Sequence, residues 1–260
     1  MRRPSFSASR FARFIAKLRH IFGIIFVGGH DLRTIKLTHL ILFVNVIIMI
    51  AMMIARLTSS FRNEAYLLLS FGAQYGPLVA RGEWYRTITA IFVHGGILHL
   101  LFNSYALFYF GTIVESIYGP EKFVVSYFLS GLVGNVATHL LYYRSVSVGA
   151  SGAIFGLVGV LFILGFKRDA PFYVRSVTGY ALLPMIVFNV VYGFLPGSGI
   201  NNAAHLGGFF TGILMGYLIK PVPSIYSRKR SVFLAWRAAA IALGVLVVYS
   251  FVMLAFRSIV

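Results

Sequence analysis

The sequence contains no cysteine and only six acidic residues in 260. The lack of cysteine excludes disulfides, a thiolate nucleophile and a thiolate metal site. Charged residues make up 11% of the chain, whereas a soluble domain has about 25%, and apolar residues make up 59%. This composition excludes an ordinary water-soluble globule. It favours a compact domain embedded in a membrane.

Long apolar stretches fill most of the chain between residues 37 and 256. Seven of them have the low charge and the length of helices that cross a bilayer, which takes about 20 residues. The expected fold is therefore an all-α polytopic membrane protein. The fourth and sixth stretches are short and rich in glycine, which indicates buried, central positions. The expected spans are residues 37–56, 96–115, 123–142, 150–166, 176–195, 203–219 and 232–256.

The chain carries 23 lysines and arginines against six acidic residues, so its formal net charge is +17. In a soluble protein this charge would suggest nucleic acid as a partner, but here the cations cluster beside apolar stretches. Such placement is typical of topology signals and of contact with anionic lipids, so membrane lipids and no nucleic acid are expected. The basic connections alternate along the chain. They predict a cytoplasmic N-terminus and place the starts of the second, fourth and sixth spans at the outer face.

Residues 1–36 form a separate basic, cytoplasmic segment in the expected domain organisation. Within it, residues 11–25 repeat large apolar side chains between cations, which predicts an amphipathic helix on the membrane surface. A disordered basic arm is the alternative. No cleavable signal peptide is expected, because cations interrupt the apolar stretch. The short polar ends and the lack of a transit-type presequence favour a bacterial plasma membrane.

Five polar side chains fall near the starts of the second, fourth and sixth spans. His94 precedes the second span, which carries His99 and Asn103 four residues apart and therefore on one helical face. Ser151 opens the fourth span and His205 the sixth. Taken singly, each of these residues would be explained by packing or structural hydrogen bonding. Their convergence at one depth indicates a functional site, because polar groups within spans are costly.

These residue types supply the parts of a serine hydrolase. A serine hydroxyl needs a base to accept its proton, so Ser151 is the candidate nucleophile and His205 the candidate base. His99, Asn103 and the Ser151 amide are candidate donors to the developing oxyanion. Gly149 is small enough to let a substrate backbone approach. No acidic residue is expected near His205, which predicts a dyad rather than a triad.

Two glycine series would let the helices that carry the serine and the histidine approach closely. Their spacings of three and four residues place each series on one helical face. Packing without catalysis is the ordinary interpretation of such a pattern. The series are Gly152, Gly156 and Gly159 in the fourth span and Gly208, Gly212 and Gly216 in the sixth.

Other intramembrane chemistries lack their residues in this sequence. There is no H-E-x-x-H motif, and the spacing of His94 and His99 separates their side chains by about 140° on a helix, so no metal is expected. No acidic residue lies in the middle of a span, which excludes an aspartyl pair. The acidic residues are Asp31, Glu64, Glu83, Glu115, Glu121 and Asp169.

These motifs resemble those of the rhomboid intramembrane serine proteases, over residues 64–219. The resemblance implies a six-helix core over residues 37–219, followed by a loop and a seventh transmembrane helix in residues 220–260. The motifs are similar to the family's H-x-x-x-x-H-x-x-x-N at His94, His99 and Asn103, its G-x-S-G at Gly149 to Gly152, and its A-H-x-x-G-x-x-x-G at Ala204 to Gly212.

The resemblance also implies roles for individual residues. Ser151 would be the nucleophile and His205 the general base, with His99, Asn103 and the Ser151 amide as oxyanion donors and His94 supporting them. Substrates would be other membrane proteins, cut in or near a transmembrane segment. The family needs no metal or cofactor.

The sequence departs from the family pattern at two positions. Tyr85 stands where a tryptophan usually precedes Arg86, and Trp84 lies one position earlier. Phe155 stands where members often carry a tyrosine that stacks on the catalytic histidine. The stacking can therefore be kept, whereas the hydroxyl is lost.

The glycine-rich end of the fifth span, with Gly197 and Gly199, indicates a flexible gate for substrates or an ordinary tight turn. Two other functional classes are open at this stage. One is an inactive rhomboid-like protein that binds membrane clients, although this chain keeps both serine and histidine. The other is a seven-helix receptor, which explains neither their convergence nor the cytoplasmic N-terminus. The substrate and the oligomeric state are not determined.

Overall fold

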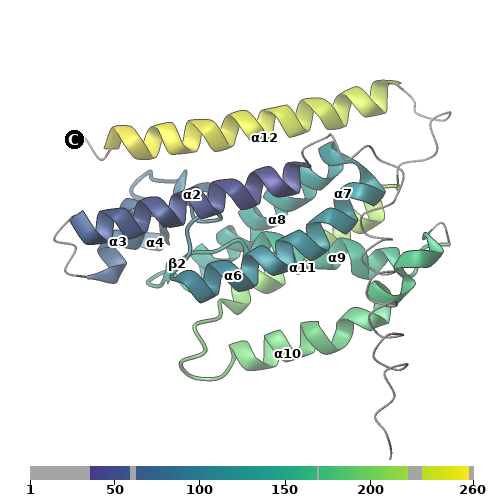
Figure 1. The fold of residues 1–260 in the computed structure, drawn as a ribbon, viewed down its shortest axis with the longest axis horizontal. Helices are drawn as coiled ribbons and strands as arrows, with labels where there is room; N and C mark the ends of the chain where they lie inside the picture. Colours follow the sequence, from purple (N-terminus) through teal and green to yellow (C-terminus); the bar gives the residue numbers. More distant parts are fainter. Residues whose placement is uncertain (1–35, 59–62, 169, 222–229, 258–260) are drawn as a thin grey trace, which may run out of the picture. The chain divides into compact units, whose positions relative to one another are not determined.

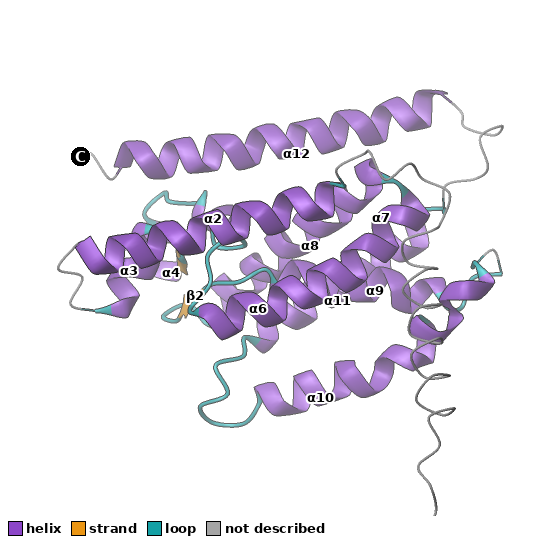
Figure 2. Ribbon diagram, in the orientation of Figure 1, coloured by secondary structure: helices purple, strands orange, loops and turns teal. Residues whose placement is uncertain are grey.

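The computed structural model describes residues 36–58, 63–168, 170–221 and 230–257, and their regular secondary structure is almost entirely helical (Figures 1 and 2). The sheet in this part of the chain is one antiparallel pair of short strands. The elements are α2 (Leu37–Thr58), α3 (Glu64–Ser70), β1 (Gln74–Tyr75), α4 (Gly76–Ala80), α5 (Arg86–Thr89), α6 (Ile97–Ala106), the π-helical turn η1 (Leu107–Gly111), α7 (Thr112–Tyr118), α8 (Pro120–Leu141), β2 (Val146–Ser147), α9 (Ser151–Leu164), the 3-10 helices η2 (Phe172–Val177) and η3 (Gly179–Leu182), α10 (Leu183–Gly193), α11 (Asn202–Leu218) and α12 (Arg230–Arg257).

Each expected span contains a helix, which confirms the all-α polytopic membrane fold. In the described part of the chain, five helical stretches are long and apolar enough to cross a bilayer, and α9 is a shorter apolar helix. The six-plus-one count of crossings stays a prediction. The amphipathic helix expected at residues 11–25 lies outside the described residues. The five stretches are Leu37–Thr58, Ile97–Tyr118, Pro120–Leu141, Phe172–Gly193 and Arg230–Phe256.

The fifth span differs from the expectation at its start. A single α-helix from residue 176 is wrong, because two 3-10 helices precede α10, which begins at Leu183. The reason lies at Gly179, whose φ of +59° does not fit a right-handed helix. A methyl group added to Gly165, at the end of α9, would overlap the Gly179 backbone. The chain is therefore bent here by a direct backbone contact.

Helix α9 forms the centre of the bundle. Of its 14 residues, all are buried except Ser151 and Phe162. It packs against α8 and α11, and these three helices supply half of the buried residues of the main apolar core. The short, glycine-rich helix is thus central, as its composition indicates.

Glycines form the contact between α9 and α11. A methyl group added to Gly208 would overlap the Gly152 carbonyl oxygen, and one added to Gly212 would overlap the Gly156 carbonyl oxygen. The two helix backbones therefore touch directly over at least one turn, and any larger side chain would separate them.

Asn201 fixes the start of α11. Its Oδ1 accepts a hydrogen bond from the Ala204 amide at 3.0 Å and so caps the helix. Its Nδ2 donates to Thr138 Oγ1 on α8 and to Ser147 Oγ on β2, each at 2.9 Å. One side chain thereby joins α8, β2 and α11 next to the candidate site.

Lysines fix the other end of α11. Lys167 Nζ, just after α9, donates to the Ile219 carbonyl at 2.7 Å. Lys122 Nζ, in the first turn of α8, donates to the Lys220 carbonyl at 2.5 Å. Cations are favourable at this position because the last carbonyls of a helix lack partners within it and carry partial negative charge.

The segment between α2 and α6 is tied to the core by polar contacts. Gln74 pairs with Ser147 in the β1–β2 ladder and donates from Nε2 to the Asn135 carbonyl at 2.7 Å. Asn135 on α8 donates to the Thr87 carbonyl at 2.8 Å. These contacts hold β2, and with it the chain leading to Ser151, against α8.

The glycine contact predicts a strong effect of one added methyl group. We expect Gly212→Ala to lower the free energy of unfolding by about 1–3 kcal/mol, because overpacking forces the helices apart. Thermal unfolding of the purified protein in detergent, followed by circular dichroism, measures the change. Gly244→Ala on α12 is the matched control, since nothing lies within 4 Å of the added methyl group there. A melting temperature of Gly212→Ala equal to that of the control would contradict the direct contact.

The hydrogen bonds of Asn201 predict a second effect on stability. We expect Asn201→Ala to cost about 2–3 kcal/mol, since it removes a helix cap and two further hydrogen bonds. Asn63→Ala is the control, because Asn63 also caps a helix, α3, through a bond to the Ala65 amide at 2.9 Å, but makes no such bridge. We expect it to cost about 1 kcal/mol. Equal losses of unfolding free energy in the two variants would show that the bridge contributes nothing.

Candidate active site

Ser151 is the first residue of α9, and its position is set by the turn before it. The Gly149 amide donates to the Ala90 carbonyl at 2.9 Å. Gly149 has a φ of +118°, a conformation that strongly favours glycine. A Cβ at this position would lie 2.8 Å from Nε2 of His99. Glycine is thus required both by the turn and by the histidine packed against it.

His94 and His99 form a pair beside this turn. Their rings meet edge to face, with centroids 5.2 Å apart. The Ala150 amide donates to His94 Nε2 at 3.5 Å, and the Gly95 amide donates to His99 Nδ1 at 3.4 Å. Since Nδ1 of His99 accepts, its proton is on Nε2, the nitrogen nearest Gly149.

His94 lies in the loop before α6 and is 1% exposed. Burial, reinforced by the neighbouring His99, lowers its pKa to about 3, so the ring is neutral at physiological pH. Its Nδ1 lies 3.2 Å from the Phe92 carbonyl and therefore carries the proton. The other nitrogen is left as an acceptor, which is how it holds the Ala150 amide.

His205 lies on the first turns of α11, with 5% of its surface exposed. Its ring is stacked on the Phe155 ring, with centroids 4.2 Å apart and an angle of 13° between the planes. Phe155 is four residues after Ser151 and thus one helical turn away on the same face. Nδ1 of His205 has no hydrogen-bond partner among the described residues.

Asn103 is buried on α6, one turn after His99. Its Nδ2 donates to the His99 carbonyl at 2.9 Å, within its own helix. The structure therefore brings His94, His99, Gly149 and Ser151 together, whereas the Asn103 amide faces its own backbone.

Arg86 is placed elsewhere, in the segment between α2 and α6. Its buried guanidinium donates to Glu83 Oε2 at 2.6 Å, and to the carbonyls of Leu69 at 2.6 Å and Ala73 at 3.0 Å. Tyr85 donates to the same carboxylate at 3.1 Å. Arg86 thus braces this segment and does not reach the serine.

Gly197 and Gly199 lie in the turn between α10 and α11. Both have positive φ, +78° and +68°, and no atom packs against either position. They serve the turn, and neither position is packed against Ser151. In the described ranges, no three histidine or carboxylate side chains gather into a group that could hold a metal.

Asn201 is the positioning residue that motif reasoning missed. It precedes the A-H motif by three residues and stabilises the helix start that carries His205. An asparagine just before an apolar helix is a recognisable cap signal. Its bridge to Thr138 and Ser147 has no signal in the sequence.

Known proteins resemble this chain over the same region. The rhomboid domain model matches residues 81–222, more than half of the chain. The chain is 39% identical over 145 residues to Rhomboid protease GluP of Bacillus subtilis (strain 168), covering 56% of this chain and 28% of that protein. It is 41% identical over 148 residues to the putative rhomboid protease YdcA of the same organism, covering 55% and 71%.

A plant relative, RHOMBOID-like protein 4 of Arabidopsis thaliana, is 35% identical over 152 residues, covering 58% of this chain and 38% of the relative. The chain thus spans about a quarter to two fifths of two of these relatives. The match nevertheless includes α5 to α11 and every element of the candidate site. Together with the apolar helices, it shows that this integral, multi-pass membrane chain belongs to the rhomboid family.

Proposed function

We propose that this chain is an intramembrane serine endopeptidase that cuts other membrane proteins in or near a transmembrane segment. Ser151 and His205 form its catalytic dyad. The names of two relatives, Rhomboid protease GluP and putative rhomboid protease YdcA, support a protease. No cofactor is needed in this mechanism. Membership of the family leaves no support for the seven-helix receptor.

One observation carries the proposal: the His205 ring is stacked on Phe155, one turn after Ser151. The stacking fixes the plane of the imidazole, and the glycine contact fixes the distance between the two helices. A neutral His205 takes the proton of Ser151 as its Oγ attacks the peptide carbonyl. The same proton is then given to the leaving amine. Water hydrolyses the resulting ester by the reverse sequence of proton transfers.

The oxyanion formed in this step meets donors that are already oriented. Ser151 begins α9, so its amide is one of the helix's first N–H groups, which lack partners within the helix. The Nε2–H of His99 lies against Gly149 on the same side of the turn. His94 supports the turn through the Ala150 amide. Asn103 would have to rotate away from its own helix to contribute a third donor.

Substrate access and orientation follow from the charge pattern. A cytoplasmic N-terminus places the starts of α9 and α11, and the site, towards the outer face of the plasma membrane. In our proposal, residues 37–219 form the catalytic core and residues 220–260 add the loop and α12. The turn with Gly197 and Gly199 gates entry, since neither glycine is packed against other atoms. Arg86 supports the segment between α2 and α6 through its ion pair with Glu83.

The dyad predicts loss of activity without loss of fold. We expect Ser151→Ala and His205→Ala each to reduce cleavage of a single-span substrate by more than about 10³-fold, because a serine without its base is not a nucleophile. Purified protein and substrate in detergent, analysed for fragments, measure this. Ser126→Ala, a buried serine on α8, is the control and should cleave normally. Cleavage by Ser151→Ala would contradict the assignment, and binding without cleavage by the wild type would identify a client-binding protein.

Loss of either candidate oxyanion donor, His99 or Asn103, should slow cleavage to a different extent. Loss of one donor costs about 10²–10³-fold in rate. We expect this for His99→Ala, whose Nε2–H already lies at the serine turn, and a smaller loss for Asn103→Ala, whose amide is engaged within α6. Single-turnover rates with saturating substrate measure both. Full activity in both variants would contradict the proposed oxyanion site.

A further inference from the structure

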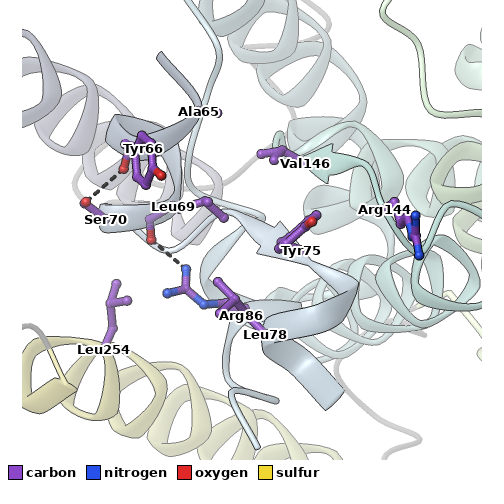
Figure 3. Close-up of a pocket in the computed structure, with 10 residues that line it drawn as sticks. All are labelled: Ala65, Tyr66, Leu69, Ser70, Tyr75, Leu78, Arg86, Arg144, Val146 and Leu254. Atoms are coloured by element: carbon purple, nitrogen blue, oxygen red, sulfur yellow. Dashed lines mark hydrogen bonds between the residues drawn. The ribbon is translucent and has the colours of Figure 1, made fainter. Parts of the chain in front are cut away.

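A cavity of about 690 Å³ lies away from the candidate active site, beside the segment between α2 and α6 (Figure 3). Its volume is within the range of about 300–1,000 Å³ typical of ligand sites. The walls come from α3, β1, α4, the start of α5, the chain after α8 and the last turn of α12. Most of the lining is apolar, with two arginines and two tyrosines: Ala65, Tyr66, Leu69, Ser70, Tyr75, Leu78, Arg86, Arg144, Val146 and Leu254.

The cavity lies at the level where spanning helices end. Arg144 follows the end of α8 at Leu141, α3 follows the end of α2, and Leu254 lies in the last turn of α12. Helices of this length end in the headgroup region of a bilayer. Exposed aromatic side chains gather at the same level, including Tyr66 and Trp84, as in the aromatic belts of membrane proteins.

The charge of the cavity comes from Arg144. Arg86 is engaged by Glu83 and by two backbone carbonyls, so its charge is already compensated. Arg144 is exposed, and no described acidic side chain lies within ion-pair distance of it. Figure 3 shows Arg144 at one side of the cavity and Leu254 at another, with Tyr75 and Leu78 between them. A ligand that suits this lining has one negative group and a long apolar part.

We infer that the cavity binds an anionic phospholipid, with the phosphate at Arg144 and an acyl chain along Leu69, Leu78 and Leu254. At the headgroup level this is the most concentrated molecule with both properties. Helix α12 takes part in the site because Leu254 forms one wall. The lipid would join α12 to the segment braced by Arg86. This inference does not depend on the proposed proteolysis.

The test compares two lipids with identical acyl chains on the full-length protein in non-ionic detergent. Native mass spectrometry should show phosphatidylglycerol bound about fivefold more strongly than phosphatidylcholine, the factor expected from one cation facing an anionic lipid. Arg144→Gln should weaken phosphatidylglycerol binding about tenfold, through loss of a charge-assisted hydrogen bond. Arg81→Gln is the matched control, since Arg81 is an exposed arginine between α4 and α5 that does not line the cavity.

A second variant tests the apolar part. Ala65→Phe fills the cavity and leaves Arg144 in place, so it should weaken binding of both lipids. Ser151→Ala should bind lipid like the wild type, which separates this test from failure of the proposed protease. The inference would be overturned if the two lipids bound equally, or if Arg144→Gln bound phosphatidylglycerol as strongly as the wild type. Displacement of phosphatidylglycerol by millimolar inorganic phosphate would also overturn it. So would displacement by an acidic substrate segment at equal concentration, which would instead identify a substrate site.

Discussion

The backbone contact between α9 and α11 is the interaction on which the rest of the structure depends. In a bilayer the hydrophobic effect does not hold helices together, because lipid tails are as apolar as the side chains. Close packing has to do so, and here Gly208 and Gly212 lie directly on the carbonyls of Gly152 and Gly156. The contact begins one residue after Ser151 and three residues after His205. The same glycines therefore determine both the stability of the core and the separation of the two proposed catalytic groups.

At the ends of the helices, polar contacts hold the structure together. At these ends backbone groups lack partners within the helix and have to be satisfied by other groups. Asn201 caps α11 and ties it to α8 and β2, whereas Gln74 and Asn135 tie the preceding segment to α8. These bonds cluster around the starts of α9 and α11. A serine at the first residue of a buried helix is thus supported by a polar layer on one side and an apolar core on the other.

The outer elements are held more loosely than this centre. Ile186 is the one buried residue of α10, and α12 presents most of its surface outward. Helix α12 contacts the core through aromatic pairs, with Tyr249 stacked on Trp84 and Phe251 packed against Phe92. In our proposal the lipid binds among these outer elements, since Leu254 of α12 lines the cavity.

The sequence alone determined the membrane class, the approximate spans, the small-residue faces and the family motifs, because apolar length and helical period are local properties. It misjudged the start of the fifth span, where Gly179 packs on Gly165 from another helix. The family resemblance already implied the stacking of the His205 ring on Phe155, which the structure shows. Only the tertiary structure decided that His99 packs against Gly149. The same holds for the Asn201 bridge and for the cavity at Arg144. These features depend on how helices far apart in sequence are rotated and spaced relative to one another. Local sequence patterns do not determine that arrangement.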